Sequence, residues 1–146
     1  MKYLLLTLAV VFIGGCQTVA TKNTDSGVPN IASDIREVSP EAAQVAVSKA
    51  YSQFIDVRTP DEYSAGHATR AVNIPLDTLN ANLDKLEKNE PVYVICQTGN
   101  RSKKAAVMLK EAGFNNILNV TGGTSASEAT GLPMGTQQPH NVPPKK

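Results

Sequence analysis

The segment "PVYVIC", residues 91–96, constrains the fold more than any other part of the sequence. Five apolar residues follow a proline with no polar residue between them, so an extended strand here would be apolar on both faces. Such a strand is typical of a parallel sheet that is buried on both sides. The segment therefore predicts the central strand of a parallel sheet.

The flanking sequence alternates further strand signals with helix signals. Two segments, "SPE" and "TPDE", place a capping residue before a proline and an acid, which indicates helix starts at residues 39 and 59. Apolar residues also recur at helical spacing. These stripes are residues 43–50, 76–86 and 105–112, the last closed by Gly113.

Three more segments, "QFIDV", "AVNIP" and "NILNV", are expected to be strands, and Gly122-Gly123 is expected to lead into a final short helix. Strands that alternate with short helices predict an α/β fold. We expect a three-layer domain with a mostly parallel sheet flanked by helices.

The N-terminal region is expected to lie outside this domain. Residues 3–13 are largely apolar, too short to span a bilayer and typical of a signal peptide. The following "IGGC" resembles the bacterial lipobox, in which the cysteine, here Cys16, is lipidated. An ordinary signal peptide that contains a cysteine is the alternative. Several acyl chains on one residue would give stable anchoring.

We divide the chain accordingly. Residues 1–15 are a lipoprotein signal peptide, 16–33 the lipidated N-terminus and flexible tether, 34–134 the folded domain and 135–146 a disordered tail. The expected location is the bacterial cell envelope, with the domain lipid-anchored and facing the periplasm. Gln17 follows the cysteine in place of Asp, which by resemblance to Gram-negative lipoproteins favours the outer membrane.

Charge and composition exclude several function classes. The net charge of +1 gives no electrostatic case for nucleic acid binding. The chain has two Cys and two His, without zinc-ligand spacing, so we expect no metal and no cofactor. If Cys16 is lipidated, Cys96 is the only free thiol of the mature protein, and no intramolecular disulfide can form. We expect a monomer.

Cys96 lies where a buried strand meets a helix, with Gly99 and Arg101 in the connecting loop. Sites of open parallel sheets form at the carboxyl ends of strands. A loop that curls at Gly99 would point N–H groups inward at a helix N-terminus, which binds anions and lowers the pKa of a cysteine. Arg101 adds a fixed charge with forked donors. The alternative is an inert core cysteine; the combined pattern favours a nucleophile.

The segments "FIDVRTPDEYSAGHATRAVNIPLD", "CQTGNRS" and "GFNNILNVTGG" resemble the rhodanese superfamily, the sulfurtransferases, over residues 35–133. The resemblance implies a rhodanese domain in which Cys96 carries sulfane sulfur as a persulfide. It also implies that the loop holds a thiosulfate-like donor. The expected substrate-binding residues are Gln97, Thr98, Gly99, Asn100, Arg101 and Ser102.

The spacing of cysteine and arginine separates two similar families. Tyrosine and dual-specificity phosphatases place five residues between them, whereas four lie between Cys96 and Arg101 here. The tighter loop favours sulfur over phosphate or arsenate. We therefore predict transfer of sulfane sulfur from thiosulfate or a persulfide donor to cyanide or a thiol acceptor. A sulfur carrier without turnover is the alternative, and a small phosphatase or arsenate reductase is less favoured.

Three further polar residues are expected to be structural and near the site. Asp56 and Arg58 bracket the end of a strand, and we predict an ion pair from Arg58 to Glu62 or Asp61. His67 is expected to be structural, with a role as a base for the cysteine as the less favoured alternative.

Two stretches depart from the pattern that the resemblance implies. "GHATRA" differs from the commoner Gly-His-Ile-Pro-Gly-Ala, with Thr69 and Arg70 in place of Pro and Gly. The frequent Trp after Gly-Gly is missing, because Gly122-Gly123 leads to "TSASEAT". The first departure predicts a different turn, in which Arg70 adds positive charge near the pocket. The missing tryptophan is expected to change the wall of the pocket and the preference for an acceptor.

Overall fold

The computed structural model describes residues 35–49 and 52–137. Strands alternate with helices along these residues, as the sequence predicts. The helical elements are α1 (Pro40–Lys49), α2 (Pro60–Ala65), the 3-10 helix η2 (Leu76–Lys85), α3 (Asn100–Glu111) and α4 (Gly123–Ala129). The strands are β1 (Ile35–Val38), β2 (Gln53–Asp56), β3 (His67–Ala68), β4 (Val72–Asn73), β5 (Val92–Ile95), β6 (Ile117–Val120) and β7 (Met134–Gly135).

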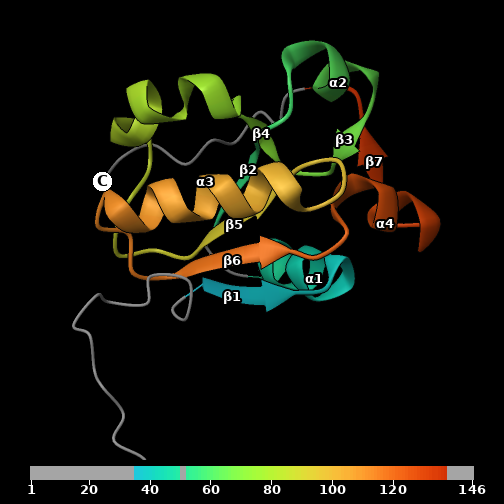
Figure 1. The fold of residues 1–146 in the computed structure, drawn as a ribbon. Helices are drawn as coiled ribbons and strands as arrows, with labels where there is room; N and C mark the ends of the chain where they lie inside the picture. Colours follow the sequence, from blue (N-terminus) through green and yellow to red (C-terminus); the bar gives the residue numbers. More distant parts are fainter. Residues whose placement is uncertain (1–34, 50–51, 138–146) are drawn as a thin grey trace, which may run out of the picture.

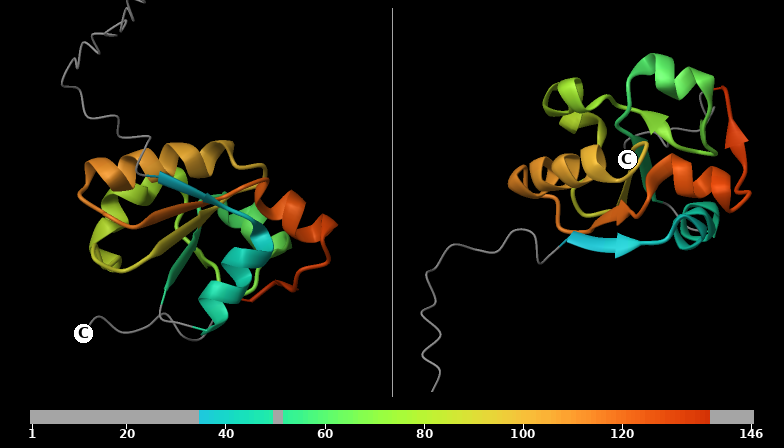
Figure 2. Two further views of the ribbon diagram at one scale, coloured as in Figure 1. Left: turned by 90° about the horizontal axis from the view of Figure 1, so that it is seen from below. Right: turned by 45° about the vertical axis from the view of Figure 1, so that its right-hand side comes forward.

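Five strands form one parallel sheet in the order β1-β6-β5-β2-β4. β5 is the central strand, as "PVYVIC" predicts, and all four of its residues are buried. The short strands β3 and β7 pair antiparallel beside this sheet, which brings His67 opposite Gly135. The predicted fold class, an α/β domain with a mostly parallel sheet flanked by helices, is confirmed (Figures 1 and 2).

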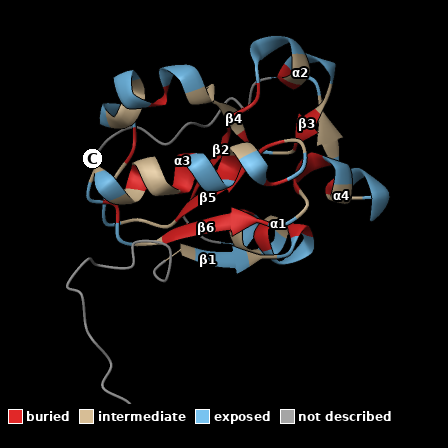
Figure 3. Ribbon diagram, viewed as in Figure 1, coloured by how far each residue is buried: buried red, intermediate tan, exposed pale blue. Residues whose placement is uncertain are grey.

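Helices cover both faces of the sheet, and alternate residues of the strands point to opposite faces. Val92 and Val94 of β5 pack under α3 and η2, where Leu109 and Phe114 are fully buried. Tyr93 and Ile95 pack on the other face against α1, which α4 contacts. Figure 3 shows the buried strands between helices whose outer surfaces are exposed. Full burial of each large apolar side chain stabilises the fold by about 1.5–3 kcal/mol.

The predicted helix starts are confirmed. Thr59 caps α2 with a capping box: its hydroxyl accepts the Glu62 N–H at 3.3 Å, and the Glu62 carboxylate accepts the Thr59 N–H at 3.0 Å. The leucine stripe at residues 76–86 forms a 3-10 helix, whose three-residue turn suits the spacing of Leu76 and Leu79. None of the described helices is long and apolar enough to cross a membrane.

Three strands were not expected from the sequence. β1 is an edge strand with exposed residues, and β3 and β7 have two residues each, so none shows a clear periodic pattern. Because β7 includes Gly135, the ordered domain extends past residue 134, the boundary expected from composition. The predicted signal peptide, Cys16, the tether and most of the tail lie outside the described residues.

The turn between β3 and β4 contains Arg70, which has a φ of 73° and is exposed. The resemblance led us to expect Arg70 near the pocket, but it does not line the cleft described below. A left-handed conformation strains a residue with a Cβ atom. Arg70→Gly is therefore expected to raise the free energy of unfolding by about 1 kcal/mol, measured by urea denaturation. Arg70→Ala, which keeps the strain, should give no such gain; equal gains in both variants would contradict this explanation.

Candidate active site

Cys96 directly follows the central strand β5, whose last residue is Ile95. The loop from β5 into α3 lies at the carboxyl edge of the sheet (Figure 1). Gly99 caps α3 with a φ of 97°, so the backbone curls there as the sequence predicts. The Cys96 side chain is only 1% exposed. The loop therefore wraps the thiol, while its outer residues Thr98 and Asn100 are exposed.

The sulfur of Cys96 lies in a ring of polar hydrogens. The Gly99 N–H donates to Sγ at 3.1 Å, and the Ser102 hydroxyl lies 3.5 Å from Sγ. Burial raises the pKa of the Cys96 thiol, but the hydrogen bond with the Ser102 hydroxyl and those from the N–H groups of Ser102, Thr98 and Gly99 outweigh it. The net result is a pKa below the ordinary value, which favours a thiolate, the nucleophilic form of cysteine.

Ser102 has a further role in this ring. Its hydroxyl donates to the Gly99 carbonyl at 3.0 Å, so it closes the loop around the sulfur. When Cys96 ionises, the same hydroxyl is within reach of the charged sulfur. A neutral donor that turns toward a developing charge stabilises it by about 1 kcal/mol or more.

Ser102→Ala is expected to raise the pKa of Cys96. Since the thiolate is the reactive form, reactivity is present above this pKa and is lost as the pH falls through it. As the pH falls, the loss of thiolate reactivity should therefore begin at a higher pH in the variant. Alkylation by iodoacetamide should be about fivefold slower at neutral pH. The measurement is the alkylation rate against pH. Ser48→Ala, an exposed serine on α1, should match the unchanged protein, and identical pH profiles for Ser102→Ala would refute the role.

The start of α4 contacts the loop between β5 and α3, residues 96–101, which we call the cysteine loop. The Thr124 N–H donates to the Cys96 carbonyl at 2.8 Å, and the Ser125 N–H donates to the Gln97 carbonyl at 3.1 Å. Gly123 allows this approach, because a Cβ atom there would lie 2.1 Å from the Cys96 carbonyl oxygen. Thr124, fully buried, directly follows Gly-Gly, where the resemblance implies a tryptophan.

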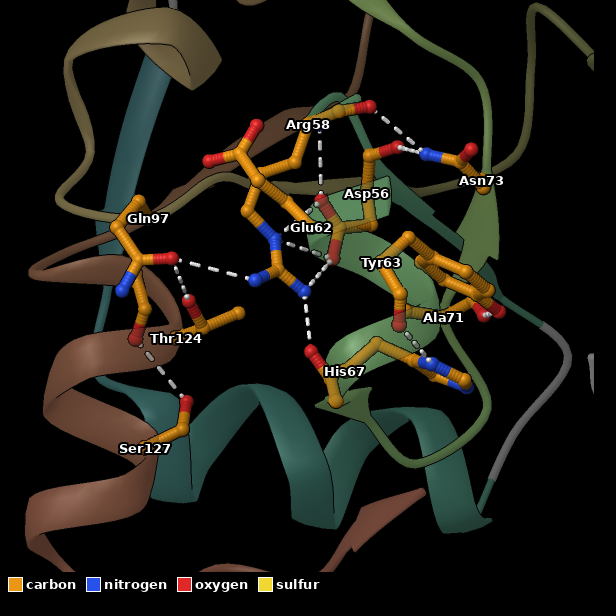
Figure 4. Close-up of polar contacts among 12 residues, drawn as sticks. Asp56, Arg58, Glu62, Tyr63, His67, Ala71, Asn73, Gln97, Thr124 and Ser127 are labelled. Atoms are coloured by element: carbon orange, nitrogen blue, oxygen red, sulfur yellow. Dashed lines mark hydrogen bonds and ion pairs between the residues drawn. The ribbon is translucent and has the colours of Figure 1, made fainter. Parts of the chain in front are cut away.

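Arg58 is buried, and its side chain contacts three segments of the chain: the end of β2, Gly66 after α2, and the loop that follows β5 (Figure 4). Its guanidinium pairs with Asp56 at 2.8 Å, and it donates to the Gly66 carbonyl at 2.6 Å and to the Gln97 side chain at 3.2 Å. The predicted pair from Arg58 to Glu62 or Asp61 is therefore wrong. Arg58 turns back to the strand end because the Asp56 carboxylate also accepts its backbone N–H, at 3.0 Å. Asp56 and Arg58 thus pair with each other at the end of β2, and Arg58 lies next to the loop residue Gln97.

Glu62 instead pairs with Arg101 of the cysteine loop. Two bonds of 2.7 and 2.6 Å join the carboxylate to the guanidinium. The Arg101 guanidinium holds the pKa of Glu62 down, at about 2, although burial opposes this. The pair also raises the pKa of Arg101. The sequence analysis named Glu62 only as a possible partner of Arg58 and missed its pairing with Arg101, which is 39 positions away.

A cleft of about 240 Å³ opens beside the loop. Gln97, which directly follows Cys96, lines the cleft, whereas Cys96 itself does not. The lining residues come from the loop, the end of β2, α2 and α4: Arg58, Glu62, Ala65, Gly66, Gln97 and Glu128. A small molecule in this cleft would therefore lie next to Gln97, the residue that follows Cys96.

His67 is held away from the cysteine. Its ring stacks on Tyr63 with the centroids 3.6 Å apart, and its nitrogens contact the carbonyls of Tyr63 and Gln137. Both ring nitrogens thus contact backbone carbonyls, and the structural role of His67 stays a prediction. No cluster of His, Cys, Asp and Glu that could hold a metal is found among residues 35–49 and 52–137.

The family of the chain follows from comparison with known proteins. The family model of the rhodanese-like domain matches residues 39–130, from the start of α1 to the end of α4. The chain belongs to the rhodanese-like family. Membership of this family supports a role in sulfur transfer, and the fold confirms the resemblance read from the sequence.

Curated relatives of this rhodanese-like protein are named for different functions. "Putative sulfur carrier protein YrkF" of Bacillus subtilis is 38% identical over 93 residues, which cover 63% of this chain and 50% of the relative. "Thiosulfate sulfurtransferase 16, chloroplastic" of Arabidopsis thaliana is 36% identical over 110 residues, 64% of this chain and 92% of the relative. The matched region thus spans half of the first relative and nearly all of the second.

Solved structures resemble the domain as well. The polysulfide-sulfur transferase homodimer of Wolinella succinogenes has a TM-score of 0.63 at 30% identity, covering 80% of this chain and 89% of that chain. A rhodanese-related protein of Thermoplasma volcanium has a TM-score of 0.63 at 29% identity, covering 70% and 99%. Both similarities extend over most of the residues that the structure describes here.

Proposed function

We propose that this protein is a sulfurtransferase that moves sulfane sulfur from thiosulfate or a persulfide donor, through a persulfide on Cys96, to cyanide or a thiol acceptor. The observation that carries the proposal is the ring of donors around the Cys96 sulfur at the N-terminus of α3. A thiolate held in this way is a nucleophile that needs no general base. The activities for which the Arabidopsis and Wolinella proteins are named support the same chemistry.

The reaction has two half-reactions. The Cys96 thiolate attacks the outer sulfur of thiosulfate and forms a new S–S bond. The old S–S bond breaks, and its electron pair leaves with sulfite. The loop N–H groups then stabilise the negative charge of the bound persulfide. In the second half-reaction, cyanide or a thiolate attacks the outer sulfur, and the electron pair of the broken bond returns to Cys96.

A sulfur carrier without rapid turnover is a second candidate. The name of the Bacillus relative, a sulfur carrier protein, supports this candidate. The two candidates differ in the second half-reaction, since a carrier gives its sulfur to a protein partner and an enzyme gives it to a small molecule.

Steady-state kinetics with thiosulfate and several acceptors test the proposal. An enzyme should form thiocyanate from thiosulfate and cyanide over many turnovers, at a rate that depends on both substrates. If Cys96 is loaded with sulfur once and no repeated thiocyanate formation follows, the result would favour the carrier. Hydrolysis of an aryl phosphate at rates comparable to sulfur transfer would contradict the argument from loop length.

We also propose that Cys16 is lipidated and anchors the domain to the cell envelope, facing the periplasm and at the outer membrane. The sequence "IGGC" after an apolar segment supports this. Fractionation of cells tests it: the unchanged protein should sediment with membranes, and Cys16→Ala should not. A Cys16→Ala form that stays with the membranes would refute the anchor.

A further inference from the structure

The Arg101 side chain is bound to Glu62 in place of standing as a free cation at the cysteine loop. Both oxygens of the carboxylate contact the guanidinium, at 2.6 and 2.7 Å, and each side chain is about a third exposed, 34% for Arg101 and 35% for Glu62. The carboxylate is also fixed from its other side by the capping box of Thr59. Glu62 is therefore oriented before any substrate arrives.

The charges around the site cancel as a result. Arg58 is compensated by Asp56, and Arg101 by Glu62. Glu128 lines the cleft as well, and no ion pair joins it to a cation within the described ranges. The side chains at the cleft and at Arg101 thus offer a donor no net positive charge, and the backbone N–H groups of the loop are the main attraction for an anion.

Donors differ in the charge that they bring. Thiosulfate carries two negative charges, and sulfite leaves with both of them. An organic persulfide carries at most one. When the Cys96 thiolate attacks the outer sulfur of R–S–SH, the new bond forms Cys96–S–SH, and R–S⁻ leaves with the electron pair of the broken bond. A site without net positive charge disfavours the dianion more than the persulfide.

We infer that Glu62 determines donor specificity, by compensating Arg101 so that the site selects organic persulfides over thiosulfate. The inference rests on the proposed function and names its donor class. Glu62 acts through Arg101 and touches no reacting atom, so it is a positioning residue. Its effect on donor choice separates this role from simple support of the fold.

Glu62→Gln tests the inference. Glutamine at this position of a capping box can still bond the Thr59 N–H, so the variant should fold. The measurement is the second-order rate constant for loading sulfur onto Cys96, followed by mass spectrometry, with thiosulfate and with the persulfide of 2-mercaptoethanol. The ratio of the thiosulfate rate to the persulfide rate should rise about tenfold at low ionic strength. An unchanged or lower ratio would overturn the inference.

Two further variants test whether Glu62 changes the donor ratio through Arg101. Asp61→Asn removes a charge from the neighbouring exposed residue of the same helix and should leave the ratio within about twofold of the unchanged protein. Arg101→Gln leaves Glu62 uncompensated and should lower the ratio, and combining it with Glu62→Gln should restore the ratio approximately. If Arg101→Gln leaves the ratio unchanged, or the double variant behaves like Glu62→Gln alone, Arg101 does not transmit the effect.

Failure of the proposed function would give a different result from failure of this inference. If the unchanged protein loaded Cys96 with neither donor, sulfur transfer itself would be refuted. A protein that loads both donors with a ratio insensitive to Glu62 would keep the proposed function and lose the inference.

Discussion

Cys96→Ser is expected to lower the rate of sulfur transfer by about 1000-fold or more, because the persulfide can form only on this sulfur. A serine hydroxyl at this position can keep the contact with the Gly99 N–H, so the loop should retain its shape. The assay is thiocyanate formation from thiosulfate and cyanide. A melting temperature close to that of the unchanged protein would show that the loss is chemical.

Cys16→Ala is the matched control, because it removes the other cysteine of the chain. It should retain sulfur transfer in detergent extracts while Cys96→Ser does not. Substantial turnover by Cys96→Ser would mean that another group carries the sulfur, and the assignment of the nucleophile would then be wrong.

Gly123→Ala is expected to lower the free energy of unfolding by about 3 kcal/mol or more. The added Cβ would lie 2.1 Å from the Cys96 carbonyl oxygen and 2.7 Å from backbone atoms of Gln97, neither of which is a flexible side chain. The φ of 62° adds further strain. Since the cysteine loop must move to relieve the contact, sulfur transfer should fall as well. Urea denaturation and the thiocyanate assay measure the two effects.

Gly131→Ala separates the contact from the backbone strain. Gly131 has a similar φ of 71°, but a Cβ there would meet nothing within 4 Å. The variant should therefore lose only about 1 kcal/mol and keep its activity. Equal losses in the two variants would show that backbone strain alone matters and that the contact between α4 and the loop does not.

Local sequence patterns predicted the fold class and the position of Cys96 between β5 and α3, because both depend on neighbouring residues. The apolar run before Cys96 marks a strand buried on both faces, and the caps at Ser39 and Thr59 mark helix starts within a few residues. The environment of the thiol could be predicted for the same reason. Gly99 and Ser102, which contact the sulfur, lie within the loop and the first turn of α3.

The long-range pairings could not be predicted in this way. Glu62 and Arg101 are 39 positions apart, and nothing local to either residue indicates that α2 lies beside the cysteine loop. Arg58 has three acids within a few positions, Asp56, Asp61 and Glu62, and sequence spacing does not show which of them it reaches. Strand order decides the pairing of Glu62 with Arg101, because it sets which segments meet at the carboxyl edge of the sheet.

Mass spectrometry of the intact protein after brief exposure to thiosulfate or to the persulfide of 2-mercaptoethanol is the most direct test of the central claim. We predict a mass increase of one sulfur atom, located on the peptide that contains Cys96, removed by cyanide and absent from Cys96→Ser. A protein that gains no sulfur from either donor, or that carries it on another residue, would contradict the claim that Cys96 is the sulfur-carrying nucleophile.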